Sequence, residues 1–174
     1  MSAQINYGFK TAMGEAGGIV DLAPYVINSF ANEADTGKMK FGVGVVSGTS
    51  AGRVNLPGAD ATAAKFEGIV VNRRTTEYDM EGKIHIRKDS TLGVMRYGHI
   101  YGRVAAGVTP AHGEPVYMIK SGDEAGYFTN VADGNLAINA RFIGAFDATV
   151  QIAAIELHAP VIATNAYKEE DNND

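Results

Sequence analysis

Three carboxylates stand at alternate positions in the stretch "EYDME", at Glu77, Asp79 and Glu81. Alternate side chains of an extended strand point to the same face, so a strand here would carry one acidic face. Such a face could bind a divalent cation or pair a general acid with a general base. The neighbouring Arg73 and Arg74 can offset its charge. We therefore interpret the stretch as a polar strand face or loop rather than as a site.

The four histidines show no spacing that is typical of a metal site. His85 alternates with isoleucines in "KIHIRK", and Lys83 and Arg87 share its face and would repel a metal ion. A zinc site needs three or four converging ligands, and the chain has no cysteine. We expect a solvent-side His85, no metal and no cofactor. The remaining histidines are His99, His112 and His158.

Sequence motifs of common catalytic sites are missing. "GTSAGR" lacks the spacing and the lysine of a phosphate-binding P-loop, and no G-x-G-x-x-G stands between a strand and a helix. No serine lies in a G-x-S-x-G elbow. "DGNLAIN" has apolar residues inside what would be a calcium loop, so it indicates a turn followed by a strand. We expect no enzymatic activity.

Composition excludes further classes of function. The chain has 174 residues, 45% of them apolar, and a net charge of −5. The last nine residues, "AYKEEDNND", hold four acids and one lysine, so the remainder is close to neutral and predicts no nucleic-acid binding. No stretch approaches the roughly 20 apolar residues of a membrane span, and the N-terminus lacks a signal-peptide pattern. We expect synthesis in a cytosol-like compartment and no membrane partner.

Alternating apolar residues and frequent turns predict a mainly β fold. In "MKFGVGVV" the residues Met39, Phe41, Val43 and Val45 lie on one face, which is typical of a half-buried strand. The chain has 21 glycines, and turn signals recur every 8 to 14 residues. These features indicate an antiparallel β-sandwich or β-barrel, jelly-roll-like, over residues 39–163. The best helix candidate, "ADATAAKFE", is short, and residues 47–64 otherwise read as loop.

The two ends of the chain differ from this body. The sequence of residues 1–38 predicts an extended N-terminal arm. Pro24 would break a helix there, and glycines flank its apolar segment from Ile19 to Phe30. Residues 164–174 predict a flexible acidic tail. Large apolar side chains gather in the arm and need a surface to pack on, so we expect them to bind a partner. They are Ile19, Val20, Leu22, Tyr25, Val26, Ile27 and Phe30.

The order of these segments resembles a known family over residues 19–158. "MKFGVGVV", a variable loop and "KFEGIVVNRRT" are followed by "GVMRYGHIYGRVAAGVTPAHGEPVYMI", and the chain closes with "ARFIGAFDATVQIAAIELHA". The sequence is similar to the head decoration, or structural cement, proteins of tailed bacteriophages. The acidic tail is not part of that pattern.

The resemblance implies a function without catalysis. It implies a β-rich protein of the virion that binds the outer surface of the head, has the major capsid protein as its partner and stabilises its shell. It also implies a homo-oligomer, a dimer or a trimer. No catalytic or cofactor-binding residue is implied.

Two other functions stay open from the sequence. A carbohydrate- or host-binding β module of a virion could use tyrosines as a sugar platform, although the chain has no tryptophan. A small β-barrel enzyme could use Glu77, Asp79 and Glu81. The tyrosines in question are Tyr97, Tyr101, Tyr117 and Tyr127.

Overall fold

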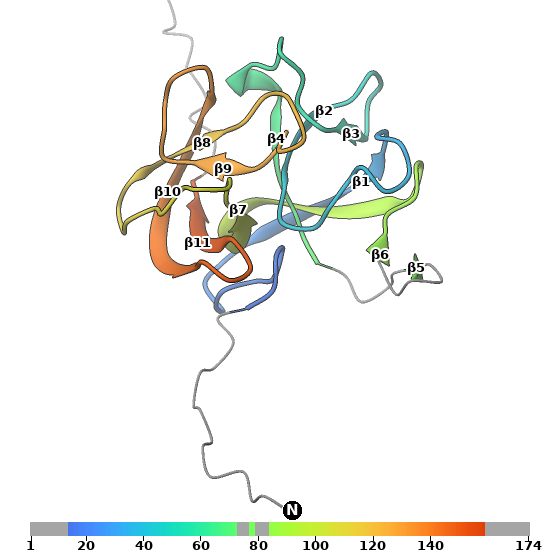
Figure 1. Ribbon diagram of the computed structural model, residues 1–174. Coiled ribbons are helices and arrows are strands. Elements are labelled where there is room, and N and C mark those ends of the chain that lie inside the picture. Colours follow the sequence, from blue (N-terminus) through green and yellow to red (C-terminus); the bar gives the residue numbers. More distant parts are fainter. Residues whose placement is uncertain (1–13, 73–76, 79–83, 159–174) are drawn as a thin grey trace, which may run out of the picture.

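Strands make up nearly all of the regular structure in the computed structural model, which describes residues 14–72, 77–78 and 84–158 (Figure 1). The expectation of a mainly β protein is confirmed. A single 3-10 turn, η1 (Ala63–Lys65), occurs within the best helix candidate. No helix in the described ranges is long and apolar enough to cross a membrane. The strands are β1 (Val26–Asn32), β2 (Gly44–Ser47), β3 (Arg53–Asn55), β4 (Phe66–Val70), β5 (Glu77–Tyr78), β6 (Ile84–His85), β7 (Thr91–Arg103), β8 (Pro115–Met118), β9 (Phe128–Thr129), β10 (Leu136–Asp147) and β11 (Ile152–Leu157).

The long strand β7 connects two groups of strands. Its first half pairs with β1 on one side and with β4 on the other. The strand order β1-β3-β2-β4-β7, together with the β1–β7 pairing, closes a five-stranded barrel. Of the two architectures that the sequence predicted, the pairing therefore supports the barrel.

The second half of β7 begins another group of strands, drawn in yellow to red in Figure 1. Gly98–Arg103 pairs with β11, and the sheet continues through β10, β8 and β9. Phe128 of β9 then forms a bridge to Val104, directly after β7. The sheet thus curls back toward the strand from which it started.

The barrel strands β2, β4 and β7 have buried side chains on both faces, and each face packs against a hydrophobic core. Val45 and Val46 are neighbours in β2, yet both are buried, Val45 in the barrel core and Val46 in the core beneath the second group. The prediction of a half-buried strand was wrong here, because the second group covers the outer face. Gly44 fits this packing, since a Cβ there would lie 2.4 Å from the Met118 sulfur.

Two further expectations need correction. Residues 53–55 form β3 inside the segment that the sequence assigned to a loop, because they pair with β2 and with the end of β1. Residues 26–32 are extended as expected but form a barrel strand, although the sequence assigned them to the arm. The arm boundary at residue 38 stays a prediction. Residues 164–174, the proposed acidic tail, lie outside the described residues.

Candidate interaction surface

The segment 14–20 is attached to the second half of β7. The Gly17 N–H donates to the Tyr101 carbonyl at 2.7 Å, and the Val20 N–H donates to the His99 carbonyl at 3.1 Å. Gly17 has a φ of +79°, and a Cβ there would lie 2.7 Å from the Val70 carbonyl oxygen. Glycine is therefore required where this segment crosses the barrel strands. These bonds hold the segment antiparallel to β7.

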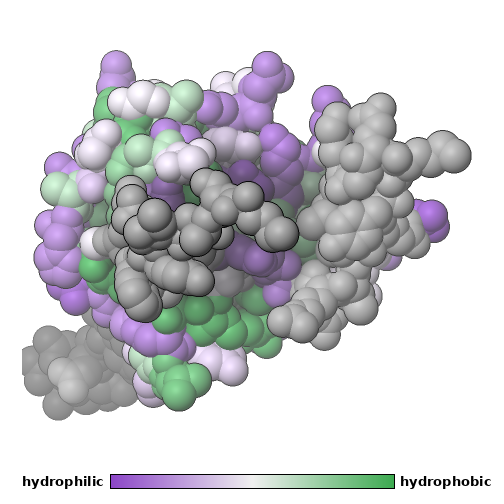
Figure 2. Space-filling view, turned by 60° about the horizontal axis from the view of Figure 1, so that its bottom comes forward, coloured by the Kyte–Doolittle hydropathy of each residue, from purple (hydrophilic) through white to green (hydrophobic). Residues whose placement is uncertain are grey.

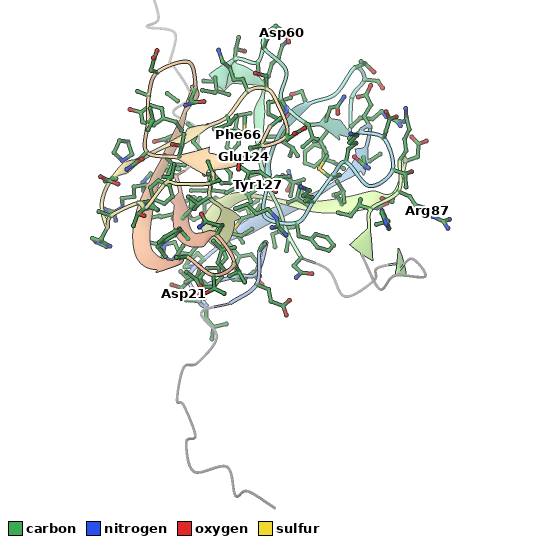
Figure 3. All side chains as sticks on the ribbon, in the orientation of Figure 1. Asp21, Asp60, Phe66, Arg87, Glu124 and Tyr127 are labelled. Carbon is green, nitrogen blue, oxygen red and sulfur yellow. The ribbon has the colours of Figure 1, made fainter. Side chains whose placement is uncertain are left out.

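The turn at residues 21–25 is held by the Asp21 carboxylate and by the close packing of Tyr25 on β7. The Asp21 Oδ2 atom lies 2.7 Å from His99 Nδ1, and Oδ1 accepts the Ala23 N–H at 2.9 Å. Tyr25 packs over Gly98, where a Cβ would come within 2.6 Å of the Tyr25 Cβ. Figure 3 places Asp21 at the lower end of the molecule. The turn therefore has a defined position although its side chains are mostly exposed.

A charged cluster borders this turn. His99 Nε2 lies 3.7 Å from Glu156, whose other carboxylate oxygen lies 2.5 Å from Arg141 Nε, and His158 is 3.9 Å from Glu156. The hydrogen bond to His99 lowers the pKa of Asp21, and the hydrogen bond to Arg141 lowers the pKa of Glu156. Both carboxylates are therefore charged at neutral pH. Asp21 connects the turn to His99 of β7, and Glu156 of β11 lies between His99 and Arg141 of β10.

Exposed apolar side chains gather on this part of the surface. Leu22 is 98% exposed, Val26 49% and Tyr25 47%. In the described ranges, only Val131 and Val150 are exposed large apolar residues elsewhere. Figure 2, which brings this end of the molecule forward, shows hydrophobic surface beside residues drawn in grey. The apolar patch, as we name it, consists of Ile19, Leu22, Tyr25, Val26, Ile27 and Tyr97.

Most of the arm residues chosen from the sequence therefore lie in the apolar patch. Ile19, Leu22, Tyr25, Val26 and Ile27 are exposed. The two others, Val20 and Phe30, are half-buried, and Phe30 packs against the barrel core. Whether these seven residues bind a partner stays a prediction.

The histidines and acids considered for chemistry do not gather into one site. Asp79 and Glu81 lie outside the described residues, and Glu77 is in β5, paired with His85 of β6. His85 is half-buried and takes part in a polar interaction. Within the residues that the structure describes, no group of three or more histidine and acidic side chains could hold a metal ion.

The four tyrosines of the sugar-platform hypothesis are dispersed. Tyr97 lies in the apolar patch, whereas Tyr101 contacts Gly14. Tyr117 of β8 pairs with Thr129 of β9, and the Tyr127 hydroxyl accepts a hydrogen bond from Lys40 at 3.0 Å. The geometry does not assemble one aromatic surface from them.

Two features of this surface were not predicted from the sequence. Tyr97 joins the apolar patch because β7 places it opposite Val26. The Asp21–His99 pair spans 78 positions of sequence, and no local pattern signals it. Both depend on the pairing of β1 and its preceding segment with β7.

The fold and this surface together define a β-barrel protein whose main exposed feature is an apolar patch on an anchored segment. The family model described as "Structural cement protein (E217 gp24/Pam3 gp6)" matches residues 3–158. The chain belongs to this family of phage structural proteins, as its sequence resemblance indicated.

A solved structure supports the fold. A chain of "The capsid of Myoviridae Phage XM1" is similar to this one with a TM-score of 0.66 and 24% sequence identity. The likeness covers 83% of this chain and 89% of that chain. No curated protein matches the sequence.

Proposed function

We propose that this protein is a decoration subunit that binds the outer surface of a phage head and stabilises the shell of the major capsid protein, without catalysis. Its membership of the structural cement family supports a role in the capsid. The similar chain from a phage capsid supports the same assignment at the level of fold. The location is then the outside of the virion.

The apolar patch is the observation that carries this proposal. Fully burying a side chain such as Leu, Ile or Val contributes roughly 1.5–3 kcal/mol. Leu22, at 98% exposure, gains almost nothing of this within the single chain. Large apolar side chains that are exposed close together in a protein are typical of an interaction site. We infer that the patch contacts other subunits in the assembled head.

The anchoring of the patch supports the same role. Segment 14–20 is bonded to β7, and the Asp21–His99 pair fixes the turn that presents Leu22. A fixed segment loses little conformational freedom when it binds. A larger part of the free energy gained by burying its apolar side chains therefore contributes to affinity. The partner-binding residues that we propose are the arm set Ile19, Val20, Leu22, Tyr25, Val26, Ile27 and Phe30.

The test compares two exposed apolar residues on heads that lack the protein. Leu22→Asp places a charge in the apolar patch, and Val150→Asp places one at a site that is 50% exposed outside it. Both variants should fold with unchanged melting temperature, because neither residue is in the core. We expect Leu22→Asp to weaken co-sedimentation with heads at least tenfold and Val150→Asp to leave it unchanged.

Electron microscopy of decorated and undecorated heads then locates the subunit. Added density on the outer face, together with heads that resist heating better, supports the proposal. Equal binding of both variants would reject the patch as the shell contact. Failure of the unaltered protein to bind any head would reject the decoration role itself.

The second candidate function is a carbohydrate- or host-binding module of the virion. The exposed Tyr97, with Tyr25 in the same patch, is the observation that favours it. Glycan binding that is lost in Tyr97→Ala, with head binding unchanged, would support this function over the first.

A further inference from the structure

A hollow of about 330 Å³ opens between the barrel and the connection of β8 to β9. One wall comes from residues near β2 and β3, and the other comes from residues 122–127. The two walls are joined, because the Gly44 N–H of β2 donates to the Gly126 carbonyl at 2.8 Å. The shape of the hollow is therefore fixed by the fold. Its main side chains are Lys38, Lys40, Val43, Leu56, Asp123 and Tyr127.

The base of the hollow is apolar. Val43 is buried in the barrel core, and Leu56 and Tyr127 are half-buried and pack against the same core. Ligand sites commonly combine such an apolar lining with a few polar groups that fix orientation. This base can accommodate one aromatic or aliphatic side chain.

Charged groups without an oppositely charged partner surround this base. Lys38, Lys40 and Asp123 are exposed. Lys40 Nζ donates to the Tyr127 hydroxyl at 3.0 Å and lies 5.4 Å from the centre of that ring. None of the three charged groups forms an ion pair with another residue that the structure describes. The hollow therefore presents two cations and one anion to a ligand.

Other lysines on neighbouring parts of the surface are already paired. Lys65 lies 3.7 Å from Asp60, and Lys88 lies 3.3 Å from Asp35. A carboxylate that approaches them meets a cation whose charge is already offset. An acidic ligand is therefore attracted more strongly to the hollow.

One segment of the chain has the matching groups in a row. Residues 167–170, within the acidic tail, read "YKEE", which is an aromatic ring, a cation and two carboxylates. The hollow offers an apolar base, an anion and two cations. The family model ends at residue 158, so membership of the family implies nothing about this segment.

We propose that residues 167–170 of the acidic tail bind in this hollow of their own chain. The two glutamates pair with Lys38 and Lys40, and the lysine pairs with Asp123. The tyrosine covers the apolar base beside Tyr127. The hollow is thus a binding site for an acidic peptide segment, and the tail is its occupant.

Contacts within the fold limit the distance that the tail has to span. Going back along β11 from His158 to Ile152 covers about 20 Å. Ile152 is paired with Arg103, whose N–H donates to the Gly42 carbonyl at 2.8 Å, and each of these two steps covers about 5 Å. Gly42 is two residues from Lys40, at most about 8 Å. Lys40 therefore lies no more than about 40 Å from His158.

The chain beyond His158 is long enough for this distance. Eleven residues lead from His158 to Glu169, and they span up to about 36–40 Å when extended. The route through the fold turns at each step, so the direct distance is shorter than its length. The long side chains of lysine and glutamate extend the reach further.

The tether favours the chain's own tail over a separate acidic segment. Exposed ion pairs each contribute little to binding, so a free segment with a few such pairs binds weakly. A flexible tether holds the tail near the hollow at an effective concentration in the millimolar range. This binding does not depend on the proposed function, because the hollow shares no residue with the apolar patch.

Zero-length cross-linking of the full chain tests the contact directly. A carbodiimide activates a carboxylate, and a lysine amine in contact with it then forms an amide bond while the activating group leaves as a urea. At low salt we expect Lys38 or Lys40 to become joined to Glu169 or Glu170, as identified by peptide mass spectrometry. Lys65, whose side chain is 53% exposed, is the control and should join the tail at least fivefold less.

A mixture of isotope-labelled and unlabelled copies distinguishes one chain from two. Cross-links within one chain join peptides of the same label, whereas cross-links between chains join both labels. We expect peptides of the same label at all protein concentrations.

A fluorescent reporter measures the same contact without chemical modification. The chain has no tryptophan, so Tyr167→Trp provides a single reporter. Its emission should lie at shorter wavelength at low salt than at 1 M salt, where the Debye length falls to about 3 Å. Adding Lys38→Glu should remove at least half of this difference, and the matched control Lys65→Glu should leave it unchanged. Both charge variants should keep their melting temperature, because both side chains are exposed.

Each outcome decides the proposal. Tail cross-links to Lys65 as frequent as those to Lys38 and Lys40 would overturn it, as would an emission wavelength that neither salt nor Lys38→Glu changes. Cross-links that join both labels at the frequency of random mixing would also overturn it, because the occupant would then be the tail of another copy. Failure of the protein to bind heads would reject the proposed function and leave this inference standing.

Discussion

Strands β1 and β11 pair with the two halves of the same long strand, β7, but differ in how far their side chains are buried. β11 lies between β7 and β10, and Ile152, Ile155 and Leu157 are at most 1% exposed. β1 lies between β7 and the short β3, and its first residues are exposed. Both strands contain branched apolar residues, so composition does not explain the difference.

The difference comes from the neighbours on the second edge. β10 pairs with β11 from Asp147 to Ala140, and its side chains close the core over that strand. β3 is three residues long and pairs with β1 only at Ala31 and Asn32. The comparison teaches that β11 has strand partners on both edges, whereas the start of β1 has, among the described residues, a strand partner only in β7 and keeps exposed apolar side chains. The following predictions test this contrast from the largest effect to the smallest.

The largest effect should come from truncating equivalent residues in the two strands. Ile155→Ala removes a fully buried side chain and should lower the free energy of unfolding by about 2–5 kcal/mol. Ile27→Ala removes one that is 36% exposed and should cost about 1 kcal/mol or less. Urea denaturation, at concentrations where single copies prevail, measures both. Similar losses for the two variants would break the comparison.

A smaller effect should follow from separating the exposed turn from β7. Gly98 has a φ of +117° and lies against Tyr25. Gly98→Ala should destabilise the chain by more than about 1 kcal/mol, because alanine is strained at positive φ and its Cβ displaces Tyr25. Hydrogen exchange should accelerate at Val20. The control is Gly107→Ala, where φ is +76° but no atom lies within 4 Å of the new Cβ. Equal effects of both substitutions would assign the loss to backbone strain alone.

The smallest effect concerns the Asp21–His99 contact beneath the turn. The His99 hydrogen bond holds the folded-state pKa of Asp21 below its ordinary value of 3.8. The contribution of Asp21 to stability is therefore present above pH 3.8 and is lost as the pH falls through the lower folded-state pKa. Asp21→Asn should lower the melting temperature slightly at neutral pH, and the difference should vanish well below pH 3.8. A difference that persists in acid would contradict the assignment.

Much of the β body could be predicted from local pattern. Alternating apolar residues and frequent turn signals predicted a mainly β protein, and strands make up nearly all of the regular structure in the described residues. Pro24 excluded a helix, and residues 26–32 are indeed extended. The core between the barrel and the second group of strands was not predictable, because it combines Val46 of β2 with Met118 and Phe128 from strands far along the chain.

By itself, the sequence determined the β class, the absence of cysteine chemistry and the gathering of apolar residues between Ile19 and Phe30. These properties depend on residue types and short spacings, which one chain displays directly. The tertiary structure decided which of those residues remain exposed, because exposure depends on the reach of β3 and on the register of β1 against β7. It also brought Tyr97 to Val26 and His99 to Asp21, contacts that only long-range strand pairing creates.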